Sequence, residues 1–286
     1  MSLELVSVAE FLGEARGVRD ALRTAGLGVV VREAGSRTRL DSPRQLLEAG
    51  EVSLALVPGD ALARLDEERC VVGAVLPRAE PRDLLLPARP THGTLVSLPP
   101  RSRVGVSGRR RSAFLRAHRP DIQPVAAWNG GGPGEVLDAG VVDALILGAA
   151  ESRRWSVAHR ATEALDAKVW IPSPGQGTPV LLCRVGDLAA LECAALVDQA
   201  SARAAWEAER VVRESLAPDG DGPLGVLALP YGRWIRVWGM VVSQDGRAVV
   251  RGDITGSLDH PRGAGLALAE LLLARGAASI IGTEVP

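Results

Sequence analysis

The segment Arg103-Val-Gly-Val-Ser-Gly-Arg-Arg-Arg-Ser-Ala-Phe-Leu-Arg116 predicts a short buried strand that passes through a Ser-Gly turn into a helix. The first turn of that helix carries three adjacent arginines, although acidic side chains are preferred at a helix N-terminus. Free backbone N–H groups and guanidinium groups together can bind carboxylate or phosphate. We therefore interpret the start of this helix, with Arg109, Arg110 and Arg111, as an anion site, and a solvated basic surface is the alternative.

The alternation of strands and helices extends on both sides of this segment. Toward the N-terminus, apolar runs over 3–8 and 52–57 predict strands with helical patterns between them. Toward the C-terminus, we expect a strand over 144–149, a helix over 153–165 and a short strand over 168–171. Two such βαβ units side by side predict two similar α/β domains with a cleft between them.

The C-terminal third follows a different pattern. A helical stretch over 188–216 precedes a loop rich in glycine, proline and aspartate. Beyond the loop, apolar residues over 224–254 alternate with a period of two, which predicts a three-stranded antiparallel sheet, and a last helix is expected over 265–275. Proline and glycine clusters near 77–87 and 172–177 predict hinges. The predicted domains are residues 1–80 with 178–198, residues 84–174, and residues 199–286.

The composition limits the classes of function. The chain has 286 residues, of which 47% are apolar and 23% charged, and this ordinary globular composition argues against a disordered chain. Its 33 basic and 34 acidic residues give a formal net charge of −1. We therefore expect neither nucleic acid nor a membrane surface as a partner. Only Lys168 among the basic residues is a lysine, and we attribute this excess of arginine mainly to codon usage.

Cysteine and histidine give no sign of a disulfide framework or a metal site. Cys70, Cys183 and Cys193 are odd in number and lack CxxC spacing, which indicates reduced, buried thiols. The four histidines have no metal-ligand spacing. We find no signal peptide and no uncharged apolar window of about 18 residues. These observations predict a cytoplasmic protein, which we expect to be a monomer.

Asp60 is the acidic residue that stands out by its position. It lies in Val57-Pro-Gly-Asp-Ala61, directly after a predicted buried strand. At the carboxyl end of such a strand, a side chain faces the crevice in which α/β proteins bind ligands. A helix N-cap is an equally good interpretation, and the residues alone leave both open.

Several short motifs occur in order and span nearly the whole chain. They are Ala74-Val-Leu-Pro-Arg-Ala-Glu-Pro-Arg-Asp83, Arg103-Val-Gly-Val-Ser-Gly-Arg-Arg-Arg111, Arg119-Pro-Asp121, Leu137-Asp-Ala-Gly-Val-Val-Asp-Ala144, Gly175-Gln-Gly177, Cys183-Arg184, Glu207-Ala-Glu-Arg210 and Leu273-Ala-Arg-Gly-Ala277. In these motifs the chain resembles porphobilinogen deaminase, also called hydroxymethylbilane synthase. The resemblance implies two periplasmic-binding-protein-like α/β domains that flank a cleft, followed by an α+β domain with a three-stranded antiparallel sheet.

Members of this family polymerise four porphobilinogen units onto a dipyrromethane cofactor, which a cysteine of the third domain holds through a thioether. The resemblance places that cysteine at Gly220 and the catalytic aspartate at Ala61. A shift of one residue would bring Asp60 into the role of the aspartate. A family arginine near the N-terminus falls around Val8, and two further arginines that bind substrate carboxylates fall on Ala127 and Pro133.

The resemblance therefore implies a divergent member of the family. We expect that the chain has lost dipyrromethane-dependent synthesis, carries no dipyrromethane, and binds a small carboxylate-bearing ligand such as a pyrrole or tetrapyrrole precursor. One alternative is an active enzyme of tetrapyrrole biosynthesis that uses a non-covalent primer, and another is a regulatory partner of an authentic deaminase. The residues expected to bind the anion are Ser107, Arg110, Arg111 and Arg154.

Overall fold

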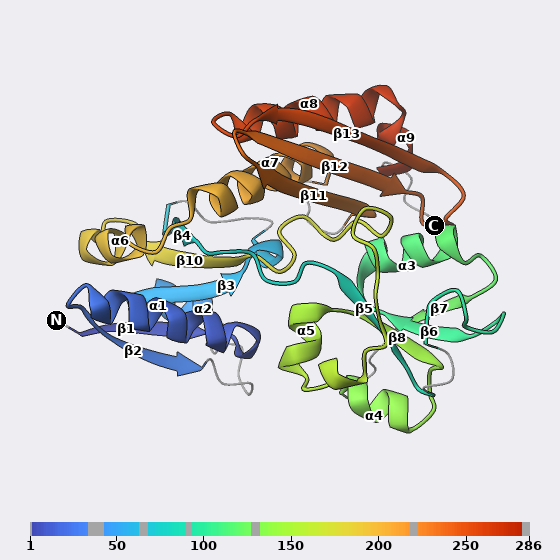
Figure 1. Cartoon of the computed structure of the whole chain (residues 1–286), viewed down its shortest axis with the longest axis horizontal. Coiled ribbons are helices and arrows are strands. Elements are labelled where there is room, and N and C mark those ends of the chain that lie inside the picture. The colour runs from blue at the N-terminus through green and yellow to red at the C-terminus, as the bar shows by residue number, and fades with distance from the viewer. Residues whose placement is uncertain are drawn as a thin grey trace.

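The computed structural model of the chain describes residues 2–33, 43–62, 68–89, 93–126, 132–217 and 222–281. These residues form three sheets, two with five strands and one with three, and helices pack against each sheet (Figure 1). We call each sheet with its helices a unit and number the units in chain order. In the described part of the chain, no helix is long and apolar enough to cross a membrane.

The first unit is built on a mixed sheet. Its elements are β1 (Ser2–Ser7), η1 (Ala9–Phe11), α1 (Leu12–Thr24), β2 (Gly28–Glu33), α2 (Pro43–Glu48), β3 (Leu54–Pro58), η2 (Gly59–Ala61), β4 (Cys70–Val75), β10 (Pro179–Arg184) and α6 (Leu188–Ala195). The strand order is β2-β1-β3-β10-β4, in which β1, β2 and β3 run parallel and β10 returns antiparallel between β3 and β4. Val180, Leu181 and Leu182 of β10 are fully buried because apolar clusters cover both faces of this strand.

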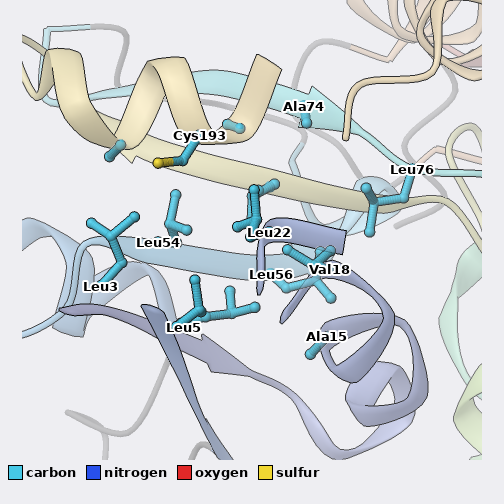
Figure 2. Close-up of a cluster of buried hydrophobic side chains, with 14 of the residues drawn as sticks. Leu3, Leu5, Ala15, Val18, Leu22, Leu54, Leu56, Ala74, Leu76 and Cys193 are labelled. Atoms are coloured by element: carbon cyan, nitrogen blue, oxygen red, sulfur yellow. The ribbon is translucent and has the colours of Figure 1, made fainter. Parts of the chain in front are cut away.

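The helix α1 covers one face of the first sheet. Ala15, Val18 and Leu22 recur at helical spacing on its buried side. Figure 2 shows these side chains directed toward Leu5 of β1 and Leu56 of β3, which belong to the same buried cluster. The amphipathic pattern of the sequence therefore places this helix on the sheet as predicted.

The second unit repeats the arrangement of the first. Its elements are β5 (Asp83–Pro87), β6 (Arg103–Val106), α3 (Gly108–His118), β7 (Gln123–Ala126), α4 (Pro133–Asp138), β8 (Ala144–Gly148), α5 (Ala149–Arg154), η3 (Ala158–Arg160) and β9 (Glu163–Ala164). The strand order is β7-β6-β8-β5-β9. β6 runs parallel to β7 and β8, whereas β5 runs antiparallel to β8 and β9.

Two elements predicted in the second unit are wrong. The helix expected over 153–165 stops early, where Ser156 adopts a left-handed φ of 57°. The strand expected over 168–171 is a turn, in which the backbone N–H of Trp170 donates to the carbonyl of Asp166 at 2.7 Å. In both places a tight turn redirects the chain, so that Val157, Leu165, Trp170 and Ile171 are buried while Trp155 and Val169 are exposed.

The third unit is an antiparallel sheet covered on one face by helices, as the sequence predicts. Its elements are α7 (Ala200–Leu216), β11 (Leu224–Tyr231), β12 (Trp234–Val242), β13 (Val249–Ser257), α8 (Pro261–Ala274) and α9 (Ala277–Ile281). The strands pair in sequence order. The helices α7 and α8 approach closely at Gly265, where a side chain would collide with the carbonyl of Ala208.

Two linkers, residues 76–82 and 172–178, connect the first and second units. They contain the proline and glycine clusters that predict hinges. The linkers are bonded to each other, since the backbone N–H of Ala79 donates to the carbonyl of Gly177 at 2.8 Å. Gly177 has a φ of 74°, and a Cβ there would lie only 2.8 Å from the Glu80 carbonyl oxygen. The crossing point of the chain is therefore tightly packed.

Candidate functional site

The sequence-predicted anion site lies at one edge of the second sheet. The parallel strands β6 and β8 end there, so Ser107 and the first residues of α3 and α5 gather at this edge. The antiparallel strand β5 begins at the same edge, because Asp83 pairs with Gly148, the last residue of β8. Sheet topology therefore brings Asp83 against the helix that carries Arg110 and Arg111.

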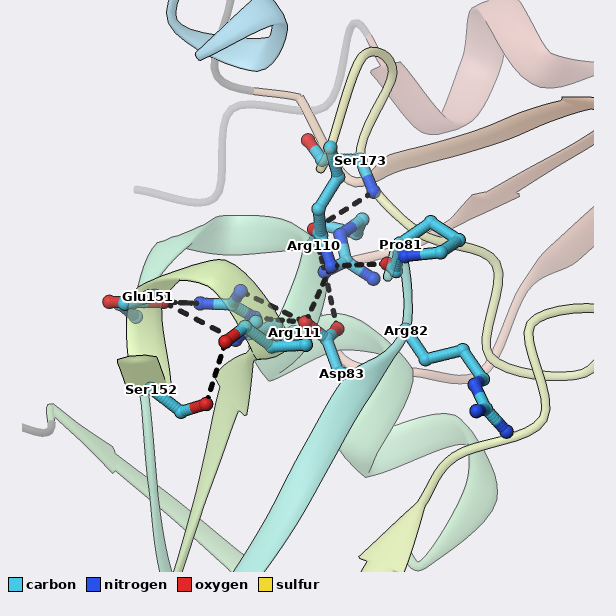
Figure 3. Close-up of polar contacts among 12 residues, drawn as sticks. Pro81, Arg82, Asp83, Arg110, Arg111, Glu151, Ser152 and Ser173 are labelled. Atoms are coloured by element: carbon cyan, nitrogen blue, oxygen red, sulfur yellow. Dashed lines mark hydrogen bonds and ion pairs between the residues drawn. The ribbon is translucent and has the colours of Figure 1, made fainter. Parts of the chain in front are cut away.

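Asp83 is fully buried and is the centre of a polar cluster (Figure 3). It accepts hydrogen bonds from Arg110 Nη2 at 2.6 Å and from Arg111 Nε and Nη2 at 3.1 and 2.9 Å. Trp170 Nε1 and Gln176 Nε2 donate to it at 2.8 and 2.9 Å. Burial alone would raise the pKa of Asp83, but the two guanidinium groups hold this pKa well below its usual range.

The guanidinium groups of Arg110 and Arg111 are directed at protein acceptors. Arg111 Nη1 also donates to Ser107 Oγ at 2.7 Å and to Glu151 Oε2 at 3.0 Å. Arg110 Nη1 donates to the carbonyl of Ile171 at 2.9 Å. Only 6% and 9% of these two arginines is exposed. The structure brings Ser107, Arg110 and Arg111 together as predicted, and two carboxylates offset their two charges. Anion binding by the three residues stays a prediction.

Arg154, the fourth predicted anion-binding residue, has a different setting. It lies at the end of α5, its side chain is 54% exposed, and it stacks on the ring of Trp155. Arg154 Nη1 is 4.0 Å from Glu10 Oε2, across the boundary between the second and first units. On the same helix, Ala150 is buried within the hydrophobic core of the first unit. The helix α5 therefore bridges the two units, with an accessible cation at its end.

Asp60 lies in η2, directly after β3, and Ala61 beside it is exposed. Burial raises the pKa of Asp60, although Arg111 and Arg213 favour its charged form. Glu10 is only 11% exposed, and burial raises its pKa to about 6 against the attraction of Arg154. The site thus holds two carboxyl groups that retain a proton more readily than usual.

Sequence reasoning missed most of the acidic half of this site. Asp83 opens the apolar run Asp83-Leu-Leu-Leu-Pro87, and a carboxylate at the start of a buried strand was the available signal. Gln176 was identified only as part of a turn motif. Glu10 lies within η1 and Glu151 in the first turn of α5, and neither carried a signal because their charge partners Arg154 and Arg111 are distant in sequence or on another element.

The remaining predicted positions give no further charge. Gly220 and Ala127 lie outside the described residues, Val8 precedes η1, and Pro133 is buried at the start of α4. In the described ranges no cluster of His, Cys, Asp and Glu could hold a metal ion.

All three cysteines of the chain are buried in the first unit. Cys70 lies in β4, Cys183 in β10 and Cys193 in α6. Burial raises the pKa of Cys183 to about 12, and it also raises the pKa of Cys193. A thiolate is the nucleophile that forms a thioether, so these residues do not fit a covalent attachment in the third unit.

Comparisons with known proteins cover nearly the whole chain. Residues 42–192 match the family model described as porphobilinogen deaminase, dipyromethane cofactor binding domain. The porphobilinogen deaminase of Roseiflexus castenholzii is 35% identical over 92% of this chain and 92% of its own length. That of Xanthomonas axonopodis pv. citri is 31% identical over 94% of both chains, and that of Moorella thermoacetica is 32% identical over 91% of this chain and 84% of its own.

Solved structures support the fold alone. Lipoprotein Tp32 from Treponema pallidum has a TM-score of 0.50 and 11% identity, covering 77% of this chain and 96% of its own. A periplasmic substrate-binding protein of an ABC transporter from Coxiella burnetii has a TM-score of 0.49 and 12% identity, covering 76% and 98%. The predicted fold class is confirmed, with two α/β units and an α+β unit that has a three-stranded antiparallel sheet.

The family match corrects one expectation. We expected no dipyrromethane cofactor because Gly220 replaces the attachment cysteine, yet the matched domain is the one that binds dipyrromethane. The match spans Asp60, Ser107, Arg110 and Arg111. The expectation was wrong because it rested on one position in the C-terminal third of the chain, whereas the match to the cofactor-binding domain lies in the first and second units. The residue at position 220 therefore does not affect the presence of the domain that matches the cofactor-binding model.

Proposed function

The chain belongs to the porphobilinogen deaminase family, and from this membership we propose that it binds a carboxylate-bearing pyrrole of the dipyrromethane class without a covalent bond. The binding site that we propose is the boundary between the first and second units near Asp60, Glu10, Arg154 and the Asp83 cluster, and we call this boundary the cleft. We further propose that the chain has lost the hydroxymethylbilane synthesis that its family carries out.

The position of the thiols carries this proposal. The family resemblance calls for a thioether to a cysteine of the third domain, and the three cysteines here are buried in the first unit. A thiol whose pKa is about 12, as at Cys183, is almost wholly protonated near neutral pH. A pyrrole held by this chain is therefore held by hydrogen bonds and ion pairs.

The cleft supplies groups of the right chemistry for such a ligand. Arg154 is an accessible cation for a ligand carboxylate, since half of its side chain is exposed. Asp60 and Glu10 are carboxyl groups that can accept a hydrogen bond from a pyrrole N–H. Arg111, fixed by Asp83 and Glu151, adds a positive charge beside Asp60.

A second candidate function is slow synthesis on a non-covalent primer. The raised pKa values of Asp60 and Glu10 favour it, because a carboxyl group with a raised pKa is a better general acid near neutral pH than an ordinary one. This candidate requires the same cleft and the same non-covalent ligand. It differs only in whether the bound pyrrole is extended.

The test combines mass and colour. The protein is incubated with dipyrromethane or porphobilinogen, desalted, and treated with Ehrlich's reagent before and after unfolding. We expect colour with the desalted native protein, none with the chain after unfolding and washing, and an intact mass equal to the bare sequence. A covalent adduct, or no retained pyrrole at all, would contradict the proposal. Uroporphyrin after oxidation of the mixture would select the second candidate.

A further inference from the structure

The turn that carries Asp60 is held from the third unit. Trp206 Nε1, on α7, donates to the carbonyl of Gly59 at 3.4 Å. About two turns further along α7, Arg213 Nη1 donates to the carbonyl of Asp60 at 2.9 Å and Nη2 to the carbonyl of Leu62 at 2.6 Å. Carbonyls of η2 and of Leu62, which follows it, therefore face α7, and Arg213 binds one of each.

Arg213 is an unusual residue with which to make this contact. It is only 4% exposed, and its buried Nε finds no hydrogen-bond partner among the described residues. The nearby carboxylate of Glu209 is already bonded to Arg78 and to the backbone N–H groups of Gly175 and Ala228. Burying a guanidinium that meets only neutral carbonyls is costly. A neutral donor would hold the turn at less cost, so we infer that the charge acts on a neighbouring group.

That neighbouring group is the Asp60 carboxyl. Four charged residues from four elements act on it, namely Arg111 of α3, Arg213 of α7, Glu151 of α5 and Glu10 of η1. The two arginines favour the ionised form and the two acidic residues oppose it. Asp60 thus lies under the influence of one cation from the second unit and one from the third.

We propose that Arg213 is a positioning residue, which fixes the η2 turn from the third unit and holds its positive charge next to Asp60. The significance of Asp60 for a ligand rests on the proposed function, but the arrangement of Arg213 and Asp60 does not. In this proposal Arg213 of the third unit affects the orientation and the pKa of Asp60 without contacting the ligand.

The experiment measures Asp60 directly in the ligand-free protein. The ¹³C carboxyl resonances of aspartate are titrated in the unaltered chain and in Arg213→Met, Arg213→Lys and Arg203→Met, and Asp60→Asn identifies the resonance. Arg203 is the control, because it lies on α7 but bonds to Asp198 and to the Gly73 carbonyl, away from η2. We expect Arg213→Met to raise the pKa of Asp60 by about one unit, since a nearby cation is lost.

The conservative and control variants separate positioning from simple packing. Arg213→Lys keeps the charge and should leave the Asp60 titration within a few tenths of a unit of its original position, while Arg203→Met should not move it. If Arg213→Met lowers the Tm but leaves the Asp60 titration unchanged, the residue only joins two units and the proposal is overturned. If Arg213→Met does not fold, Arg213→Gln, which is neutral but can still donate to one carbonyl, serves in its place.

Binding of porphobilinogen is measured separately on the same proteins. We expect Arg213→Met to weaken it about tenfold and Arg213→Lys to restore most of the loss. Failure of the unaltered chain to bind any pyrrole would overturn the proposed function alone, because the titration needs no ligand. A pyrrole affinity equal in Arg213→Met and the unaltered chain would contradict the positioning role.

Discussion

Two carboxyl groups, the fully buried Asp83 and the partly buried Asp60, have opposite surroundings. Asp83 receives hydrogen bonds from Arg110, Arg111 and two further side chains, and its pKa lies well below the usual range. At Asp60 burial outweighs the attraction of Arg111 and Arg213, and its pKa is raised. The comparison shows that the donors around a carboxyl group decide whether its pKa ends below or above the usual value.

The largest effect is expected when the carboxylate of Asp83 is removed. Asp83→Asn leaves Arg110 and Arg111 buried with only Glu151 as a carboxylate partner, and we expect a loss of about 3–5 kcal/mol in the free energy of unfolding. Urea denaturation measures it. The control Asp138→Asn removes an exposed ion pair to Arg160 and should cost about 1 kcal/mol or less. Equal effects of the two substitutions would mean that the Asp83 cluster does not support the fold.

The next effect tests the opposite side of the comparison, at Glu10. Its pKa is raised to about 6, so ionisation destabilises the folded state as the pH rises from the ordinary value of 4.5 through about 6. Glu10→Gln should therefore stabilise the protein by about 1–2 kcal/mol near pH 7.5 and leave it unchanged near pH 4. Urea midpoints at the two pH values measure this. If Glu10→Gln does not increase the free energy of unfolding near pH 7.5, burial does not raise the pKa of Glu10.

A smaller effect concerns the accessible cation of the cleft. Arg154→Ala should weaken the binding of porphobilinogen or dipyrromethane about tenfold, equivalent to about 1.4 kcal/mol, with little change in Tm. Isothermal titration calorimetry measures the affinity. Arg103→Ala is the matched control, because Arg103 is half exposed and begins β6, at the end of that strand away from the cleft. Equal losses in the two variants would place the ligand elsewhere.

The smallest expected effect is at the thiols. Because Cys70, Cys183 and Cys193 are buried, iodoacetamide should leave the native chain unlabelled and should label all three after unfolding. Intact mass measures the labelling. As a control, protein that has been unfolded and refolded without iodoacetamide is labelled under native conditions, and its thiols should again stay unlabelled. Rapid labelling of one thiol in the folded chain would reopen covalent attachment of a pyrrole.

Local pattern was enough to predict the fold, and chain connectivity explains what it missed. Ala15, Val18 and Leu22 mark α1, and the period of two over 224–254 marks the third sheet. The helix expected over 153–165 failed because a single left-handed residue ends it, and nothing in the apolar spacing signals such a turn.

The candidate site was only half predictable for the same reason. Arg110 and Arg111 are visible in the sequence as adjacent charges. Their partner Asp83 lies 27 and 28 positions away from them, and Gln176 lies 93 positions from Asp83. These contacts exist only because β5 runs antiparallel and starts beside the end of β8. Side-chain chemistry therefore predicted the cations, and topology supplied the carboxylates that bind them.

The place of β10 in the first sheet has a consequence for how the protein is made. Pro179 pairs with Pro58, more than one hundred positions earlier in the chain. On the ribosome, β3 emerges with one edge unpaired and stays so until the whole second unit has been synthesised. Contacts so distant in sequence are slow to form, and open strand edges invite association with other chains. During synthesis the N-terminal half is therefore most prone to aggregate while β3 has an open edge, and pairing of β10 with β3 closes that edge.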